Sequence, residues 1–180
     1  MKTKLLAALL FLPLLFTTSC EKEDVTQYQT GQVTMRMKND TTTCVYEEVN
    51  IDVRSVEVRI GGSTGGDWYK LQTQAGIYNV LTLRNGIDAL IANEKVPTGE
   101  IMAVRLNLGT NNSIRKNGTL YPIAIPAGEE TGLQYEIYEM IGPTDLNLHL
   151  VFNAGQSVVQ DGQESFHLKP VIWVYEDSLR

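Results

Sequence analysis

The chain has 180 residues, a formal net charge of −6 and two cysteines. This length is enough for one domain with a hydrophobic core and too short for two comfortable ones. An acidic chain without basic clusters argues against nucleic acid as a partner and against binding to anionic membrane surfaces.

The N-terminus has the three parts of a secretory signal. Lys2 and Lys4 precede an apolar run from Leu5 to Phe16, and small or hydroxylated residues lead to Cys20. A helix of this run would rise about 18 Å, which is short of the roughly 30 Å hydrocarbon core of a bilayer. We therefore expect residues 1–19 to be a removed signal peptide rather than a membrane span.

The cut site resembles that of bacterial lipoproteins, in which a small residue precedes a lipid-accepting cysteine. Ser19-Cys20 fits this pattern, whereas Thr17 stands where a Leu, Val or Ile is usual. The alternative is an ordinary signal peptidase cut near Thr18 that leaves Cys20 as a free thiol. We expect Cys20 to be lipidated and to attach the protein to a membrane, since several acyl chains give a stable anchor.

Directly after Cys20, the residues Lys22, Glu23 and Asp24 resemble the export signal of Bacteroidetes surface lipoproteins. In that signal a lysine and two acidic residues begin two positions after the lipidated cysteine. The alternative is a charged tether that holds the domain clear of the lipid headgroups. The resemblance predicts an outer membrane lipoprotein that faces the cell exterior.

Removal of residues 1–19 leaves 161 residues (180 − 19) and, without Lys2 and Lys4, a net charge of −8. Cys44 then has no thiol partner, so we expect no intramolecular disulfide despite an oxidising compartment. Residues 20–30 are polar and lack periodicity, which indicates a tether. A domain over residues 31–176 and a tail over 177–180 follow.

Alternation of apolar and polar residues, typical of half-buried strands, recurs through the whole domain. Its parity slips at Arg54-Ser55, which predicts a β-bulge inside a long strand. The glycine-rich segment Gly61–Gly66 lacks the Lys-Ser/Thr ending of a phosphate-binding loop, so we expect a hairpin loop. Asn117-Gly118 predicts a two-residue hairpin turn.

Asn85–Ala92 is the one plausible helix, because Ile87, Leu90 and Ile91 give it an amphipathic pattern. All other segments read as short strands separated by turn residues. Together they predict an all-β fold, an antiparallel immunoglobulin-like or transthyretin-like sandwich with one short helix.

The order of the motifs resembles a bacterial family, domain of unknown function 4382, found in secreted and lipid-anchored proteins. The motifs that carry the resemblance are spread from Gly31 to Tyr175 and include Glu48–Val53, Gly76–Leu81, Pro97–Glu100, Phe152–Ala154 and Leu168–Ile172. The family has no assigned activity, so the resemblance implies fold and location only. Asn39–Cys44 departs from its Asp-Pro-rich turn, and Val151 and Asn153 replace acidic residues that relatives often have.

No motif for catalysis, a metal or a cofactor stands out. Asp145, Asn147 and His149 share one strand face opposite a leucine row, so we expect them to face solvent rather than to bind a metal, which needs three or four converging ligands. Adjacent strand residues point to opposite faces, which argues against a glycosidase pair at Glu47-Glu48 or Glu129-Glu130. The other histidine, His167, has no partner motif. We therefore expect a protein that is not an enzyme.

Aromatic residues are the strongest remaining indication of a ligand. Trp68 and Tyr69 are adjacent in a strand, so one faces the core and the other faces out. Tyr121, Tyr138 and Trp173 are also placed to reach a sheet surface. Such rings beside amides suit sugar rings, although in sandwiches most of them fill the core or cover edges.

Two functions of different class follow from these patterns. The first is a non-enzymatic binding module on the cell envelope, which contacts a glycan or a protein. The alternative is a structural or accessory subunit of a surface assembly. A contiguous patch of the aromatics would favour the first, and a long uncovered edge strand the second. Asp40-Thr41-Thr42 also resembles the short O-glycosylation acceptor of exported Bacteroidetes-type proteins.

Overall fold

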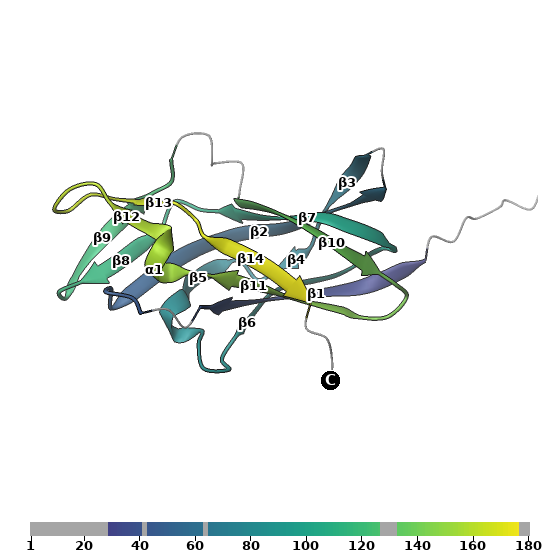
Figure 1. The fold of residues 1–180 in the computed structure, drawn as a ribbon, viewed down its shortest axis with the longest axis horizontal. Helices are drawn as coiled ribbons and strands as arrows, with labels where there is room; N and C mark the ends of the chain where they lie inside the picture. The colour runs from purple at the N-terminus through teal and green to yellow at the C-terminus, as the bar shows by residue number, and fades with distance from the viewer. Residues whose placement is uncertain (1–28, 41–42, 63–64, 127–132, 177–180) are drawn as a thin grey trace, which may run out of the picture.

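The computed structural model describes residues 29–40, 43–62, 65–126 and 133–176. These residues form two sheets that pack face to face (Figure 1). The five-stranded sheet consists of β1 (Thr30–Asn39), β4 (Gln72–Thr73), β6 (Ala89–Pro97), β11 (Leu146–Phe152) and β14 (Ile172–Glu176). The nine-stranded sheet consists of β2 (Glu48–Gly62), β3 (Gly65–Lys70), β5 (Gly76–Asn79), β7 (Gly99–Leu108), β8 (Ser113–Lys116), β9 (Thr119–Ala124), β10 (Leu133–Ile141), β12 (Val158–Gln160) and β13 (Phe166–Leu168).

The strand order of the smaller sheet is β14-β11-β1-β6-β4. The larger sheet has the strand order β10-β7-β2-β8-β9-β13-β12. Two further strands, β3 and β5, also pair with β2. Figure 1 shows β2 extending along much of the elongated molecule, with the β8–β9 hairpin at one end. The expectation of an all-β sandwich is confirmed.

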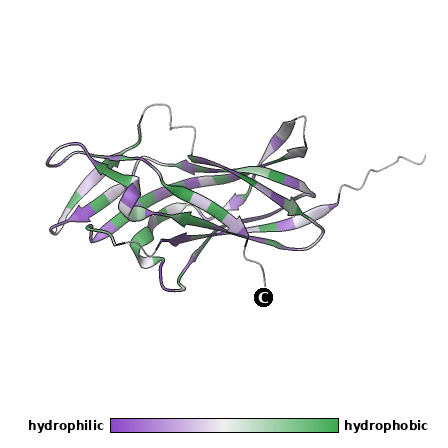
Figure 2. Ribbon diagram, in the orientation of Figure 1, coloured by the Kyte–Doolittle hydropathy of each residue, from purple (hydrophilic) through white to green (hydrophobic). Residues whose placement is uncertain are grey.

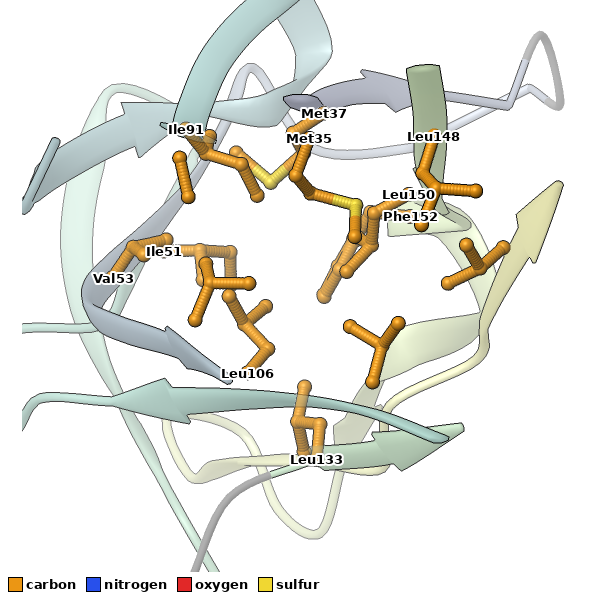
Figure 3. Packing of buried hydrophobic residues seen from close by; sticks show 14 of the residues in the cluster. Met35, Met37, Ile51, Val53, Ile91, Leu106, Leu133, Leu148, Leu150 and Phe152 are labelled. Carbon is orange, nitrogen blue, oxygen red and sulfur yellow. The ribbon is translucent and has the colours of Figure 1, made fainter. Parts of the chain in front are cut away.

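The core lies between the two sheets and follows the alternation of the strands. Hydrophobic and hydrophilic residues alternate along the ribbon in Figure 2. Figure 3 shows side chains of β1, β6 and β11 facing those of β2, β7 and β10. Met35, Ile51 and Phe152 are completely shielded from solvent. Burial of a side chain of this size contributes roughly 1.5–3 kcal/mol to stability.

The predicted β-bulge in β2 is confirmed. The register between β2 and β7 shifts between Val53 and Ser55, so one extra residue changes which face each later side chain takes. The bulge keeps Ile51 before it and Val58 after it in the same core. The part of β2 before the bulge pairs with β8 and β5, and the part after it pairs with β7 and β3.

Both predicted hairpins are also present. Gly61 pairs with Gly66 between β2 and β3, and a Cβ on Gly61 would collide with the carbonyl oxygen of Gly65. Asn117 and Gly118 join β8 to β9 with φ angles of 51° and 75°. Positive φ at both central residues is the requirement of a type I′ turn.

Two parts of the fold differ from the sequence-based expectation. The sheets are mixed rather than purely antiparallel, because β1 pairs with β11 in parallel and β13 pairs with β9 in parallel. Alternation alone cannot distinguish the two directions of pairing, since its period is the same in both.

The predicted helix over Asn85–Ala92 is wrong. Asn85 and Gly86 form a turn with φ angles of 56° and 85°, and Ala89, Leu90 and Ala92 pair with β1 as part of β6. Pairing with β1 satisfies the backbone of this short apolar segment, which overrides its weak helical pattern. The helical turns of the described residues are η1 (Val80–Thr82) and α1 (Ala154–Ser157), and none of these residues forms a helix long and apolar enough to cross a bilayer.

The packing predicts a large difference between two isoleucines on neighbouring strands. Ile51 in β2 is fully buried, whereas Ile77 in β5 is 58% exposed. Ile51→Ala should lower the free energy of unfolding by about 2–5 kcal/mol, because it leaves a cavity. The matched control Ile77→Ala should change it by less than about 0.5 kcal/mol. Denaturation of the full chain by urea measures both, and equal losses would contradict this core.

Candidate ligand pocket

The outer face of the five-stranded sheet carries a group of polar and aromatic side chains. The inward positions of β1 and β11 are the core residues, so the alternating positions point outward. Pairing of β11 with β1 and with β14 aligns these outward residues in two rows, Arg36-His149-Tyr175 and Lys38-Val151-Trp173. These rows form the floor of a pocket.

Residues 83–88, between η1 and β6, form a wall of this pocket. The cavity has a volume of about 530 Å³. Its lining includes residues 83–88 and every residue of the two rows other than Arg36. The main-chain N–H of Asn39 donates to the carbonyl of Leu83 at 2.6 Å, which attaches the segment to the end of β1. The volume lies within the range of small-molecule sites.

Asp88 holds the wall against the floor. Arg36 Nη1 donates to one carboxylate oxygen of Asp88 at 2.6 Å, and Nε2 of His149 lies 3.3 Å from the other. Burial opposes ionisation of Asp88, but the hydrogen bonds and positive charge of Arg36 and His149 outweigh it. The pKa of Asp88 is therefore lowered from its ordinary value of 3.8.

The floor presents stacked rings and a cation. The rings of His149 and Tyr175 stack with their centroids 5.4 Å apart and an interplanar angle of 28°. Lys38 Nζ lies 4.6 Å from the centre of the Tyr175 ring and hydrogen-bonds to the Tyr175 hydroxyl. Trp173 extends the aromatic surface on the same side of β14. The arrangement suits a ligand with an apolar face and several polar groups.

The prediction that His149 faces solvent is wrong. Its side chain does point to the outer face, as alternation predicts, but His149 is only 7% exposed. Asp88, in the segment 83–88, and the Tyr175 ring contact it. These contacts join segments far apart in the sequence, so no local pattern indicated them. The turn signal of Asn85-Gly86 could have revealed that Asp88 lies in a loop rather than in a helix.

The four aromatics proposed as ligand-facing do not form one patch. Tyr69 packs against the core cluster, and Tyr121 packs both against this cluster and on the Phe166 ring, with centroids 5.4 Å apart. Trp68 lies half-buried on β3 beneath the guanidinium of Arg105, 3.8 Å from its ring centre. Tyr138 on β10 is 68% exposed.

Other candidate residues lie outside the pocket or outside the described residues. His167 is partnered by Asp161 at 2.6 Å, and Cys44 is a half-buried free thiol. Within the described ranges, no three His, Cys, Asp or Glu side chains gather as they would around a metal ion. The predicted lipidation and export residues, Cys20, Lys22, Glu23 and Asp24, precede the described part, and Thr41, Thr42, Glu129 and Glu130 fall in its gaps.

The chain belongs to the family of the domain of unknown function DUF4382, whose model matches residues 30–170. No curated protein matches the chain. A crystal structure of a proposed cell adhesion protein from Bacteroides fragilis is similar to it, with a TM-score of 0.40 and 15% sequence identity. The similarity covers 84% of this chain and 46% of that protein, so the chain spans less than half of its length.

The contacts of Asp88 predict a pH dependence of stability. A carboxylate with a lowered pKa stabilises the fold above its ordinary value of 3.8, and this contribution is lost as the pH falls through the folded-state pKa. Asp88→Asn should lower the free energy of unfolding by about 1 kcal/mol at neutral pH. It should also reduce the loss of stability that the parent shows on acidification below pH 3.8.

Urea denaturation at several pH values measures this effect. Asp145→Asn, which alters an exposed carboxylate outside the cavity, serves as the matched control and should keep the parent's acid loss. The assignment fails if Asp88→Asn loses as much stability on acidification as the parent does.

Proposed function

We propose that this member of the family is a non-enzymatic, lipid-anchored binding module of the cell surface, whose pocket takes a saccharide. The observation that carries the proposal is the cavity of about 530 Å³ with Tyr175 and Trp173 beside amide and charged groups. The apolar faces of sugar rings pack on aromatic rings, and their hydroxyls exchange hydrogen bonds with side chains such as Lys38 and Asn85.

The state of Asp88, one of two carboxylates in the pocket lining, favours binding over glycoside hydrolysis. A glycosidase needs one carboxylic acid whose pKa is raised so that it can protonate the leaving group. Asp88 has a lowered pKa and both of its oxygens are engaged, by Arg36 and His149. The described lining contains no Ser, Thr or Cys that could act as a nucleophile.

A glycan array with the full chain in nonionic detergent tests the saccharide proposal. We expect the parent to retain a defined set of glycans and Trp173→Ala to weaken this binding about tenfold, because it removes part of the aromatic surface. Tyr138→Ala removes an exposed ring remote from the pocket lining and should leave binding unchanged. Absence of glycan binding by the parent, or equal binding by Trp173→Ala, would exclude this pocket as a saccharide site.

One observation favours the second candidate function, a subunit of a surface assembly. Among the described strands, only β7 pairs with β10, so one edge of β10 has no strand partner within the described residues. This edge strand carries the exposed Tyr138 and Met140. An uncovered edge can accept a strand from another protein. A pull-down from envelope extracts beside the glycan array separates the two functions, and sugar binding without a protein partner would exclude the assembly.

The proposed location follows from Cys20 and from Lys22, Glu23 and Asp24. Protease treatment of intact cells should cleave the parent, because the domain faces outward. Replacement of Lys22, Glu23 and Asp24 by Ala should leave the protein protected until the cells are lysed. A parent that resists protease in intact cells, or a variant cleaved as readily as the parent, would refute the surface location.

A further inference from the structure

The outer face of the nine-stranded sheet, on the opposite side of the sandwich from the pocket, carries a ladder of polar contacts along β2. Outward side chains of β2 are joined to the neighbouring strands by hydrogen bonds of 2.8–3.2 Å, in the pairs Glu48-Arg115, Asn50-Ser113, Ser55-Asn107 and Glu57-Arg105. Such pairing satisfies polar groups that lie half-buried on a flat sheet face.

Arg59 is the exception in this ladder. The structure gives it no hydrogen bond or ion pair with any described residue, and its Nε atom is shielded from solvent without an acceptor. Its register partners are Trp68 on β3 and Ala103 on β7. Glu136 follows in the same row on β10, beyond Ala103, and is not paired with Arg59. The two Nη groups of Arg59 are not shielded in this way and also have no acceptor among the described residues. They are therefore the donors that a partner from outside the chain can reach.

A second guanidinium lies beside Arg59. The guanidinium carbon of Arg105 is 3.8 Å from the centre of the Trp68 ring, and that of Arg59 is 5.8 Å from the same centre. Glu57 does not neutralise both guanidinium groups. One of its oxygens accepts from Arg105 at 3.2 Å, and the other accepts from Asn107 at 3.1 Å. Two cations thus share one indole ring on a chain whose net charge is −6.

We propose that Arg59 and Arg105, held over Trp68, form a binding site for an oxyanion, namely the sulfate or carboxylate group of an acidic glycan. Guanidinium groups present a planar fork of donors that matches these anions, and an anion here would accept hydrogen bonds from the Nη groups of Arg59. Free inorganic sulfate has the same chemistry, so the two sources are separated by experiment. The site is independent of the saccharide pocket, because it lies on the other sheet and shares no residue with its lining.

The chain has two tryptophans, so Trp173→Phe leaves Trp68 as the only fluorescent indole at the site. We expect inorganic sulfate and a chondroitin sulfate tetrasaccharide to change the Trp68 fluorescence of this full-length variant saturably, with the glycan binding more tightly. Arg59→Gln in this background should weaken binding of both probes about tenfold, because it removes charge-assisted hydrogen bonds. Arg115→Gln, on the same face but paired with Glu48, is the matched control and should keep the parent affinity.

Nuclear magnetic resonance of the arginine Nε–H groups in the unaltered chain gives a second readout that needs no tryptophan substitution. The Nε–H signal of Arg59 should shift on addition of sulfate, and that of Arg115 should not. The proposal is overturned if neither probe binds saturably up to about 50 mM, or if Arg59→Gln and Arg115→Gln bind alike. Binding of inorganic sulfate with no gain for the tetrasaccharide would overturn the assignment to a glycan.

Discussion

The parallel pairing of β1 with β11 is the constraint on which the pocket depends. It places Arg36 beside His149 and Lys38 beside Val151, although β1 and β11 lie far apart in the sequence. β14 then extends the two rows with Tyr175 and Trp173. A shift of β11 by one residue in this register would turn His149 and Val151 into the core and its inward leucines outward. Core packing therefore fixes the pocket floor as firmly as it fixes the hydrophobic interior.

Both faces of β11 are buried from Leu148 to Phe152. Leu148 and Leu150 point into the sandwich, while His149 and Val151 are covered on the outer face. Parallel strands are commonly covered on both faces, whereas antiparallel strands often leave one face to water. Here residues 83–88 lie along the outer face beside the pocket, and the ion pair of Asp88 with Arg36 attaches this segment to β1. Because this segment is a loop rather than a strand, it leaves a cavity for a ligand.

Much of the sandwich could be predicted from the sequence because its signals are local. Alternation revealed β1, the parity slip at Arg54-Ser55 revealed the bulge, and Asn117-Gly118 revealed a hairpin. The direction of strand pairing could not be predicted in this way, since it depends on contacts between distant segments. The segment Asn85–Ala92 was misassigned because its apolar spacing fits a helix equally well when its partner strand is unknown.

The candidate site was less predictable than the fold. Trp173 was expected at a sheet surface and does line the pocket, but Asp88 and Lys38 gave no signal of their own. Their chemistry arises from a register and a loop contact that only the folded chain creates. Among the aromatics expected to meet a ligand, Tyr69 and Tyr121 pack against the core. Alternation could not predict this, since it does not show which face of a strand packs on the other sheet.

Residues 83–88, His149 and Tyr175 line one pocket that exists before any ligand binds, with Asp88 in contact with His149. Nuclear Overhauser contacts in the full chain without ligand test this most directly. The structure predicts contacts between the His149 and Tyr175 rings, whose centroids are 5.4 Å apart, and between His149 and Asp88. A His149 ring that contacts only its neighbours within β11 would show that the pocket is not preformed.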